Sequence, residues 1–406
     1  MSTTALQIPI AKPCFFGDEG QAIQDVLNSG WVSQGPTVQR FERALCDCTG
    51  SPYAVAATSW TTAFHLAFLI YGIGTGDDVL CPSYSFIATA NVVRYVGATP
   101  RFVDIDPKTL NLCPVLTEAY IQEHYQSNTD GHWHHKQTSN RLKAIELVHQ
   151  IGIPADIDGF KALGQRYNCQ IFEDSACAIG STYKGQPIGS SGLVGAFSFH
   201  PRKTLTTGEG GMLLLPDEDK AIQAGQLRTH GMSISDLARH GQKSTVFEQY
   251  DQLGYNYKMT DIQAALGLSQ LSHLDEMLDK RIAIAQQYDA AFANIEGLSI
   301  IQAPDYVTRW NVQSYPIRLV GASIEQRSQF MERLQERGVS SRRGIPPAHR
   351  EPLYCNSEAS AAMALPNTET VSAESLFIPI YPSMTETEVA HVIDSVQATA
   401  NALRLV

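Results

Sequence analysis

The sequence predicts an α/β protein, with a large domain built on a mostly parallel sheet covered by helices and a smaller α+β domain after it. Short apolar runs alternate with segments of helical periodicity from Tyr53 to Asp174, and the pattern changes beyond Ser299. The chain has 406 residues and is 43% hydrophobic, which is enough for two domains with sizeable cores.

The alternating part is preceded by two short predicted helices, at 20–29 and 37–46. Strands are then predicted at 53–57, 78–81, 100–104, 144–149 and 170–174, and helices at 61–71, 86–96 and 156–167. Repeated strand–helix–strand units build parallel sheets with helices on both faces. A ligand is therefore expected at the carboxyl ends of the strands.

The second half of the chain follows a different pattern. An apolar stripe of leucines predicts one long helix over 260–295, and strands are expected near 315–317 and 376–380, with helices at 325–337 and from Glu386 onward. We therefore predict a large domain over 1–260, a connecting helix over 261–298 and a small α+β domain over 299–406.

One polar segment, from Glu118 to Asn140, interrupts the alternation. Its histidines at 132, 134 and 135 are nearly adjacent, lack the i, i+4 spacing of a helical metal pair and have no nearby cysteine motif. We predict a solvated loop and no metal site.

Charge and cysteine content exclude several classes of partner. The formal net charge is −11 and there is no long Lys/Arg run, which argues against a nucleic-acid or membrane surface. The eight cysteines form no C-x-x-C pair, and no apolar run is long enough to span a membrane. A reducing compartment, the cytoplasm, is expected.

The most informative stretch is SFHPRKTLTTGEGG, residues 198–211. It places a single lysine, Lys203, after an aromatic-rich strand and before three glycines. A lysine held in this way suits covalent bonding to a cofactor aldehyde, since a neutral amine can form a Schiff base there.

Three further stretches fall at predicted strand ends. Residues 58–62, TSWTT, suit either a phosphate cradle at a helix start or a plain helix cap. Phe86 follows a buried strand, where it can stack on a planar ring or pack in the core. Asp174 ends an apolar strand, and because burying an unpaired carboxylate is costly, a protonated pyridine nitrogen is a fitting partner.

The order of these features matches pyridoxal phosphate (PLP) enzymes of the aspartate-aminotransferase superfamily. The sequence resembles, more closely, the PLP-dependent sugar aminotransferases of the DegT/StrS family. The resemblance covers nearly the whole chain and rests on SGWVSQGP at 29–36, GATP at 97–100, FSFHP at 197–201, LRTHG at 227–231 and GYNYKMTDIQAA at 254–265.

The resemblance implies a role for each residue of the site. Lys203 would bind PLP as a Schiff base, and Asp174 would pair with the pyridinium nitrogen. Phe86 would stack on the ring. The phosphate would be held by Ser59, Thr61, Ser198, the backbone N–H of Trp60 and, from the neighbouring subunit of a homodimer, Asn256. The implied fold is a large domain with a mixed seven-stranded sheet plus a small C-terminal domain.

Three departures from the family pattern stand out. Cys177 replaces a Gln or His near the ring hydroxyl of the cofactor. Trp60 replaces a glycine beside the phosphate, so its ring must point elsewhere. The segment 118–140 is longer than usual.

The implied reaction is transfer of an amino group from L-glutamate to a keto sugar, giving an amino sugar for bacterial surface polysaccharide such as lipopolysaccharide. The sugar would be nucleotide-linked or an oxidised acidic sugar. The alternatives are a sugar dehydratase on the same fold, whose members carry His at the lysine position, and a non-catalytic regulatory or binding protein. Candidates for substrate anions, each of which could instead form a surface ion pair, are Arg228, His230, Arg309, Arg342, Arg343 and His349, with Tyr183 and Lys184 as further candidates.

Overall fold

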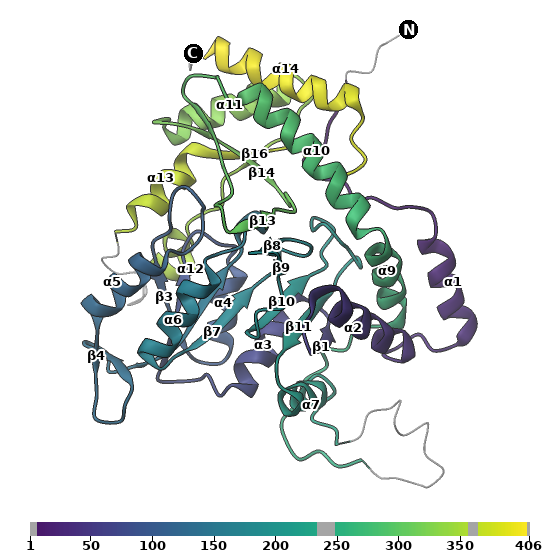
Figure 1. Ribbon diagram of the computed structural model, residues 1–406, viewed down its shortest axis with the longest axis vertical. Helices are drawn as coiled ribbons and strands as arrows, with labels where there is room; N and C mark the ends of the chain where they lie inside the picture. The colour runs from purple at the N-terminus through teal and green to yellow at the C-terminus, as the bar shows by residue number, and fades with distance from the viewer. Residues whose placement is uncertain (1–5, 234–247, 356–363, 404–406) are drawn as a thin grey trace.

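A computed structural model describes residues 6–233, 248–355 and 364–403 (Figure 1). Its central sheet has nine strands: two short strands lie off the main path, and the other seven follow the order β1-β11-β10-β7-β6-β2-β3. Their bounds are β1 Tyr53–Ala57, β2 Asp77–Pro82, β3 Thr99–Val103, β6 Arg141–Val148, β7 Gln170–Asp174, β10 Val194–Ser198 and β11 Gly211–Leu215. The seven strands are parallel except β11, which is antiparallel to both its neighbours. The predicted mostly parallel sheet is confirmed.

Side-chain alternation along the strands gives the sheet two apolar faces. Leu213 and Leu215 face one layer of helices, whereas Met212 and Leu214 face the other. One face is covered by α3 (Trp60–Ile70), α4 (Ala88–Tyr95) and α7 (Glu218–Leu227). Helices α2 (Pro36–Thr49), α5 (Pro114–His124), α6 (Ile157–Tyr167) and α9 (Asp261–Ser272) pack on the other face. Helix α1 (Glu19–Ser29) packs against α9.

The segment 118–140 is not the solvated loop that its composition suggests. It contains the end of α5 and a hairpin of two short strands, β4 (Tyr125–Ser127) and β5 (Trp133–His135), and β5 pairs with the first residue of β6, an interior strand of the sheet. Tyr125 is buried and its hydroxyl donates to Asp78 Oδ2 at 2.8 Å. This buried hydrogen bond to the sheet explains why a polar segment is ordered.

A second sheet lies in the C-terminal part, with four antiparallel strands in the order β12-β14-β16-β15. Their bounds are β12 Leu298–Ile300, β14 Tyr315–Leu319, β15 Arg342–Arg343 and β16 Ser375–Ile378. Helices α10 (Leu274–Phe292), α11 (Ile324–Glu336) and α14 (Glu386–Ala402) share a core with this sheet, and α12 (Pro352–Cys355) and α13 (Pro366–Glu374) complete the region (Figure 1). Ile8, from the N-terminal segment, lies in the same core, so the chain start packs with the predicted small domain.

The predicted single helix over 260–295 is wrong. Two helices, α9 and α10, meet at His273, whose φ of −104° and ψ of 9° interrupt the helical backbone. The His273 ring stacks on Phe16, with ring centroids 3.9 Å apart, and its Nε2 lies 3.2 Å from Asp18 Oδ1. The break is therefore accompanied by tertiary contacts to the N-terminal segment.

A small third sheet joins the two main parts. It consists of β8 (Thr182–Tyr183), β9 (Gln186–Pro187) and β13 (Val307–Arg309), the last of which comes from the C-terminal half. Among the helices of the described ranges, none has both the length and the apolar character needed to cross a membrane.

Candidate active site

A cavity of about 780 Å³ opens at the carboxyl ends of β7 and β10, next to the N-terminus of α3. This is the edge at which the sequence predicts a ligand. Eight of the predicted cofactor residues line this one cavity: Ser59, Trp60, Thr61, Phe86, Asp174, Cys177, Ser198 and Lys203. They are up to 144 positions apart in the chain, from Ser59 to Lys203 (203 − 59), and the sheet brings them together.

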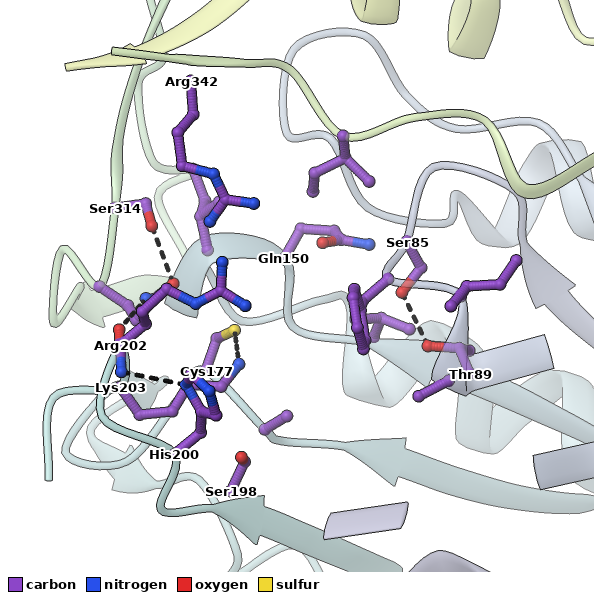
Figure 2. A pocket seen from close by; sticks show the side chains of 18 of the residues that line it. Ser85, Thr89, Gln150, Cys177, Ser198, His200, Arg202, Lys203, Ser314 and Arg342 are labelled. Carbon is purple, nitrogen blue, oxygen red and sulfur yellow. Dashed lines mark hydrogen bonds between the residues drawn. The ribbon is translucent and has the colours of Figure 1, made fainter. Parts of the chain in front are cut away.

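Lys203 lies in the tight connection between β10 and β11. Its backbone N–H donates to His200 O at 2.8 Å, and Thr207 N donates to Phe199 O at 3.0 Å, which closes the turn. Gly208 has a φ of +80°, a backbone conformation that favours glycine. The Lys203 side chain extends into the cavity, where Nζ lies 2.9 Å from Cys177 Sγ (Figure 2).

Asp174 ends β7 and is almost completely buried, with 4% of its surface exposed. Its Oδ1 accepts from Ala176 N at 3.1 Å and its Oδ2 accepts from Thr89 Oγ1 at 3.1 Å. Burial raises the pKa of this carboxyl to about 6, although these hydrogen bonds and the charge of Lys203 act in the opposite direction. A buried carboxylate at a cavity wall is stabilised by a cationic partner placed beside it.

Helix α3 begins at the cavity with a capping box. Ser59 Oγ accepts from Thr62 N at 3.2 Å, while Thr62 Oγ1 accepts from Ser59 N at 3.0 Å. The first backbone N–H groups of a helix lack intrahelical acceptors and favour an anion. A Cβ on Gly211 would overlap the backbone of Ser59 and Trp60, so this glycine allows β11 to approach the helix start closely.

The Trp60 ring lies away from this helix start. It is 5% exposed, belongs to the core under α3 and stacks on Phe64 with ring centroids 4.5 Å apart. Its backbone therefore stays available at the cavity. By contrast, Phe86 is 69% exposed although it is a large apolar side chain that lines the cavity. Exposed aromatic surface of this kind suits contact with a planar ligand.

Asn256 does not line the cavity of its own chain. It is exposed and pairs through its backbone with Thr229. Asn256 could therefore contact a bound cofactor only in the cavity of another subunit.

The predicted substrate residues fall into two groups. Arg342 and Arg343, on the edge strand β15, line the cavity. Arg228 does not: it is buried, pairs with Glu42 and donates to Ala56 O at 2.7 Å. Arg309 pairs with Asp275 and Asp279 outside the cavity.

The remaining candidates also lie outside the cavity. His230 is exposed in a turn after α7. His349 is buried, with Nδ1 2.6 Å from Ser83 Oγ and Nε2 3.0 Å from Glu369. Tyr183 donates its hydroxyl to Asp156 at 3.0 Å, and Lys184 pairs with Asp158. His349, Tyr183 and Lys184 thus contact other protein groups outside the cavity, as residues with a structural role do.

Residues 14–397 match the model of the DegT/DnrJ/EryC1/StrS aminotransferase family. The chain belongs to this family. It is accordingly a PLP-dependent sugar aminotransferase, and PLP is its cofactor. The resemblance inferred from the sequence motifs, and the α/β fold class it implies, are confirmed.

Solved structures of the family have the same fold. The aminotransferase TlmJ from Streptoalloteichus hindustanus is 29% identical, with a TM-score of 0.85, 98% of this chain and 100% of that chain covered. PseC from Helicobacter pylori, an aminotransferase involved in the biosynthesis of pseudoaminic acid, is 25% identical, with a TM-score of 0.86 and the same coverage. Spr1654 from Streptococcus pneumoniae is 27% identical and has been solved in two forms, each of which covers 98% of this chain. The PLP form has a TM-score of 0.85 with 99% of that chain covered, and the PMP form has a TM-score of 0.86 with 100% covered.

The residues of the cavity fit the cofactor of this family. Four groups line one space: an exposed aromatic ring, a buried carboxyl that has no ion pair within the described residues, a lysine amine and a helix start. These are the groups that a phosphorylated, cationic, aromatic aldehyde requires. Within the described residues, no group of three or more His, Cys, Asp or Glu side chains could hold a metal ion.

The motifs alone did not reveal some residues of the site. Thr89 was predicted only as part of a helix, yet it donates to Asp174 and lies 2.8 Å from Ser85 Oγ (Figure 2). Arg202 precedes Lys203, lines the cavity and has its carbonyl held by Gln313 Nε2 at 2.8 Å. Its position next to the lysine was a usable signal. The contact with Gln313, 111 positions away, left none in the sequence.

Proposed function

We propose that the protein moves an amino group from L-glutamate to a keto sugar, with Lys203 and Asp174 as its catalytic residues. The observation that carries the proposal is the placement of a lysine amine and a buried carboxyl on the walls of one cavity beside a helix start.

PLP, when bound, supplies an aldehyde that combines with amines and a ring that withdraws electrons from the substrate α-carbon. Lys203 Nζ would hold that aldehyde carbon. Once the donor amine has replaced it, the same nitrogen would move a proton between the donor α-carbon and the C4′ carbon of the cofactor. The contact of Nζ with Cys177 keeps the amine inside the cavity.

Asp174 would keep a proton on the ring nitrogen. The pKa of Asp174 is raised to about 6, mainly by burial, and a further cation next to the carboxyl would lower that pKa and favour the ionised form. Thr89 and Ala176 N–H orient the two carboxylate oxygens. The helix start at Ser59, with Thr61 and Ser198, would bind the phosphate, and Phe86 would cover the ring.

The acceptor is proposed to be a nucleotide-linked keto sugar or an oxidised acidic sugar, and the product an amino sugar for a bacterial surface polysaccharide such as lipopolysaccharide. The likeness to PseC, a protein of pseudoaminic acid biosynthesis, supports a sugar as acceptor. We further propose a cytoplasmic homodimer, in which Asn256 of each subunit reaches the phosphate in the other. The exposure of Asn256, outside its own cavity, supports this arrangement.

A sugar dehydratase on the same fold is the closest alternative. The lysine at position 203 argues against it, because dehydratases of this kind carry histidine there. A non-catalytic protein is disfavoured because the cavity contains both of the proposed catalytic residues, Lys203 and Asp174.

Absorbance spectroscopy of the purified holoenzyme separates the three. Addition of L-glutamate alone should convert the lysine-bound cofactor to its amine form in a single turnover, with one equivalent of 2-oxoglutarate released. A dehydratase that carries histidine in place of this lysine would have no lysine-bound cofactor to convert, and a binding protein would show no spectral change with any amino donor.

A further inference from the structure

Three arginines line the cavity: Arg202, Arg342 and Arg343. Arg202 directly precedes Lys203, whereas the other two form β15 of the second sheet. Figure 2 shows the Arg202 and Arg342 side chains entering the same space from opposite walls, next to Lys203 and Cys177. The cationic groups therefore come from two separate parts of the fold.

None of these three arginines forms an ion pair within the described residues, whereas Arg101 pairs with Asp78, Arg228 with Glu42 and Arg318 with Glu374. Several other arginines also have no ion pair, so what distinguishes these three is that they line one cavity.

The arginines also affect one another electrostatically. The pKa of Arg342 is lowered, first by partial burial and then by the positive charges of Arg202 and Arg343. The pKa of His200 is lowered by burial and by Arg202 and Lys203. Asp174, Glu209 and Glu351 line the same cavity, but none forms an ion pair with the three arginines within the described residues. The guanidinium groups therefore repel one another, and an anion bound between them would relieve this repulsion.

We propose that Arg202, Arg342 and Arg343 form one anion site that serves both substrates in turn. It would bind the carboxylates of a dicarboxylic amino donor in the first half-reaction. In the second it would bind an anionic group of the sugar, so that a neutral keto sugar would be a poor acceptor. This inference rests on the proposed function, in which donor and acceptor occupy the same cavity at different times.

Arginine suits this task for a chemical reason. Its planar guanidinium donates two parallel hydrogen bonds to a carboxylate or a phosphate, and it remains charged when partly buried. The same guanidinium group can donate these two hydrogen bonds to a carboxylate or to a diphosphate. A site that binds the two anions in turn therefore needs no rearrangement. Gln313 donates a hydrogen bond to the backbone carbonyl of Arg202 and so helps to hold this residue in place at the cavity.

The test measures binding and half-reactions with the holoenzyme of the full chain. The variants are Arg202→Gln and Arg342→Gln, and the matched control is Arg166→Gln, which removes an exposed arginine that pairs with Glu118 on the helix surface. Glutarate, an unreactive dicarboxylate, and inorganic pyrophosphate are titrated by calorimetry. The glutamate-dependent spectral change is followed by stopped flow at a series of concentrations.

We expect wild type and Arg166→Gln to bind both anions equally well, and each cavity variant to bind them at least tenfold more weakly. The L-glutamate concentration at half-maximal rate should rise about tenfold in both variants, with a limiting rate within about threefold of wild type. Loss of glutarate binding only would assign the site to the donor carboxylate, and loss of pyrophosphate binding only to the acceptor phosphate; either result overturns the shared site.

The two proposals fail separately. If wild type shows no reaction with L-glutamate but anion binding falls in the two variants, the anion site stands and the donor assignment is wrong. If the variants bind both anions as wild type does, or wild type binds neither, the anion site is wrong even when transamination is observed.

Discussion

The side-chain amine of Lys203 lies 2.9 Å from the sulfur of Cys177, and both groups line the same cavity. A cofactor attached to this lysine would therefore cover the thiol. The contact also shows that a small side chain at position 177, in place of the Gln or His that the family resemblance led us to expect, still reaches the lysine.

Alkylation of Cys177 should depend on the cofactor. We expect iodoacetamide to label Cys177 in the cofactor-free protein at least tenfold faster than in the holoenzyme, because the bound ring blocks access. Cys48, which is exposed, is the internal control and should react at the same rate in both. Peptide mass spectrometry measures both sites in one digest, and equal labelling of Cys177 with and without PLP would contradict the arrangement.

Asp174→Asn should stabilise the cofactor-free protein and inactivate the holoenzyme. The pKa of Asp174 is raised to about 6 by burial, so the folded state binds more protons than the unfolded chain between about pH 4 and pH 6. The ionised carboxyl then lowers the free energy of unfolding above pH 6, and replacing it should raise that energy by about 1–2 kcal/mol at pH 8 and not at pH 4.

In the holoenzyme the same change should lower the transamination rate by about a hundredfold or more, because the ring nitrogen loses its anionic partner. Asp289→Asn is the control: burial also raises the pKa of Asp289, but this residue lies outside the cavity. The activity of the Asp289→Asn variant should match that of wild type. Stability is measured by urea unfolding at both pH values, and a loss of stability at pH 8 in Asp174→Asn would contradict the account.

Much of this site could be anticipated from sequence because each residue sits at the end of a predictable element. Asp174 follows an apolar run, and Lys203 lies between a strand and a glycine turn. The features that the sequence did not predict involve residues far apart in the chain. The break at His273 is accompanied by stacking on Phe16, more than 250 positions away (273 − 16 = 257), and the β4–β5 hairpin by a hydrogen bond from Tyr125 to Asp78. Such tertiary contacts leave no local pattern.

Thr89→Val should weaken the cofactor's electronic activation while leaving the fold intact. The hydroxyl donates to Asp174 Oδ2, and its loss should raise the pKa of that carboxyl. We expect a fall in the glutamate half-reaction rate of about tenfold and a shift in the pH profile toward higher pH. Thr117→Val is the matched control, since the buried Thr117 hydroxyl has no partner within the described residues. Identical pH profiles for both variants and wild type would count against a role for Thr89.

Gly211→Ala should weaken PLP binding by at least tenfold. The added methyl group would overlap the backbone at Ser59 and Trp60 and displace the start of α3, where the phosphate is proposed to bind. Gly225→Ala, in α7, is the control because a Cβ there meets nothing within 4 Å. Cofactor affinity is measured by fluorescence titration, and an unchanged affinity in a folded Gly211→Ala protein would place the phosphate elsewhere.

The central claim is that the amine of Lys203 carries the cofactor in the resting protein. Borohydride reduction of the holoenzyme followed by peptide mass spectrometry tests it directly. We predict a single phosphopyridoxyl group on the peptide that contains Lys203, and none in Lys203→Ala. A label on another lysine, or its absence from the wild-type protein, would contradict the account.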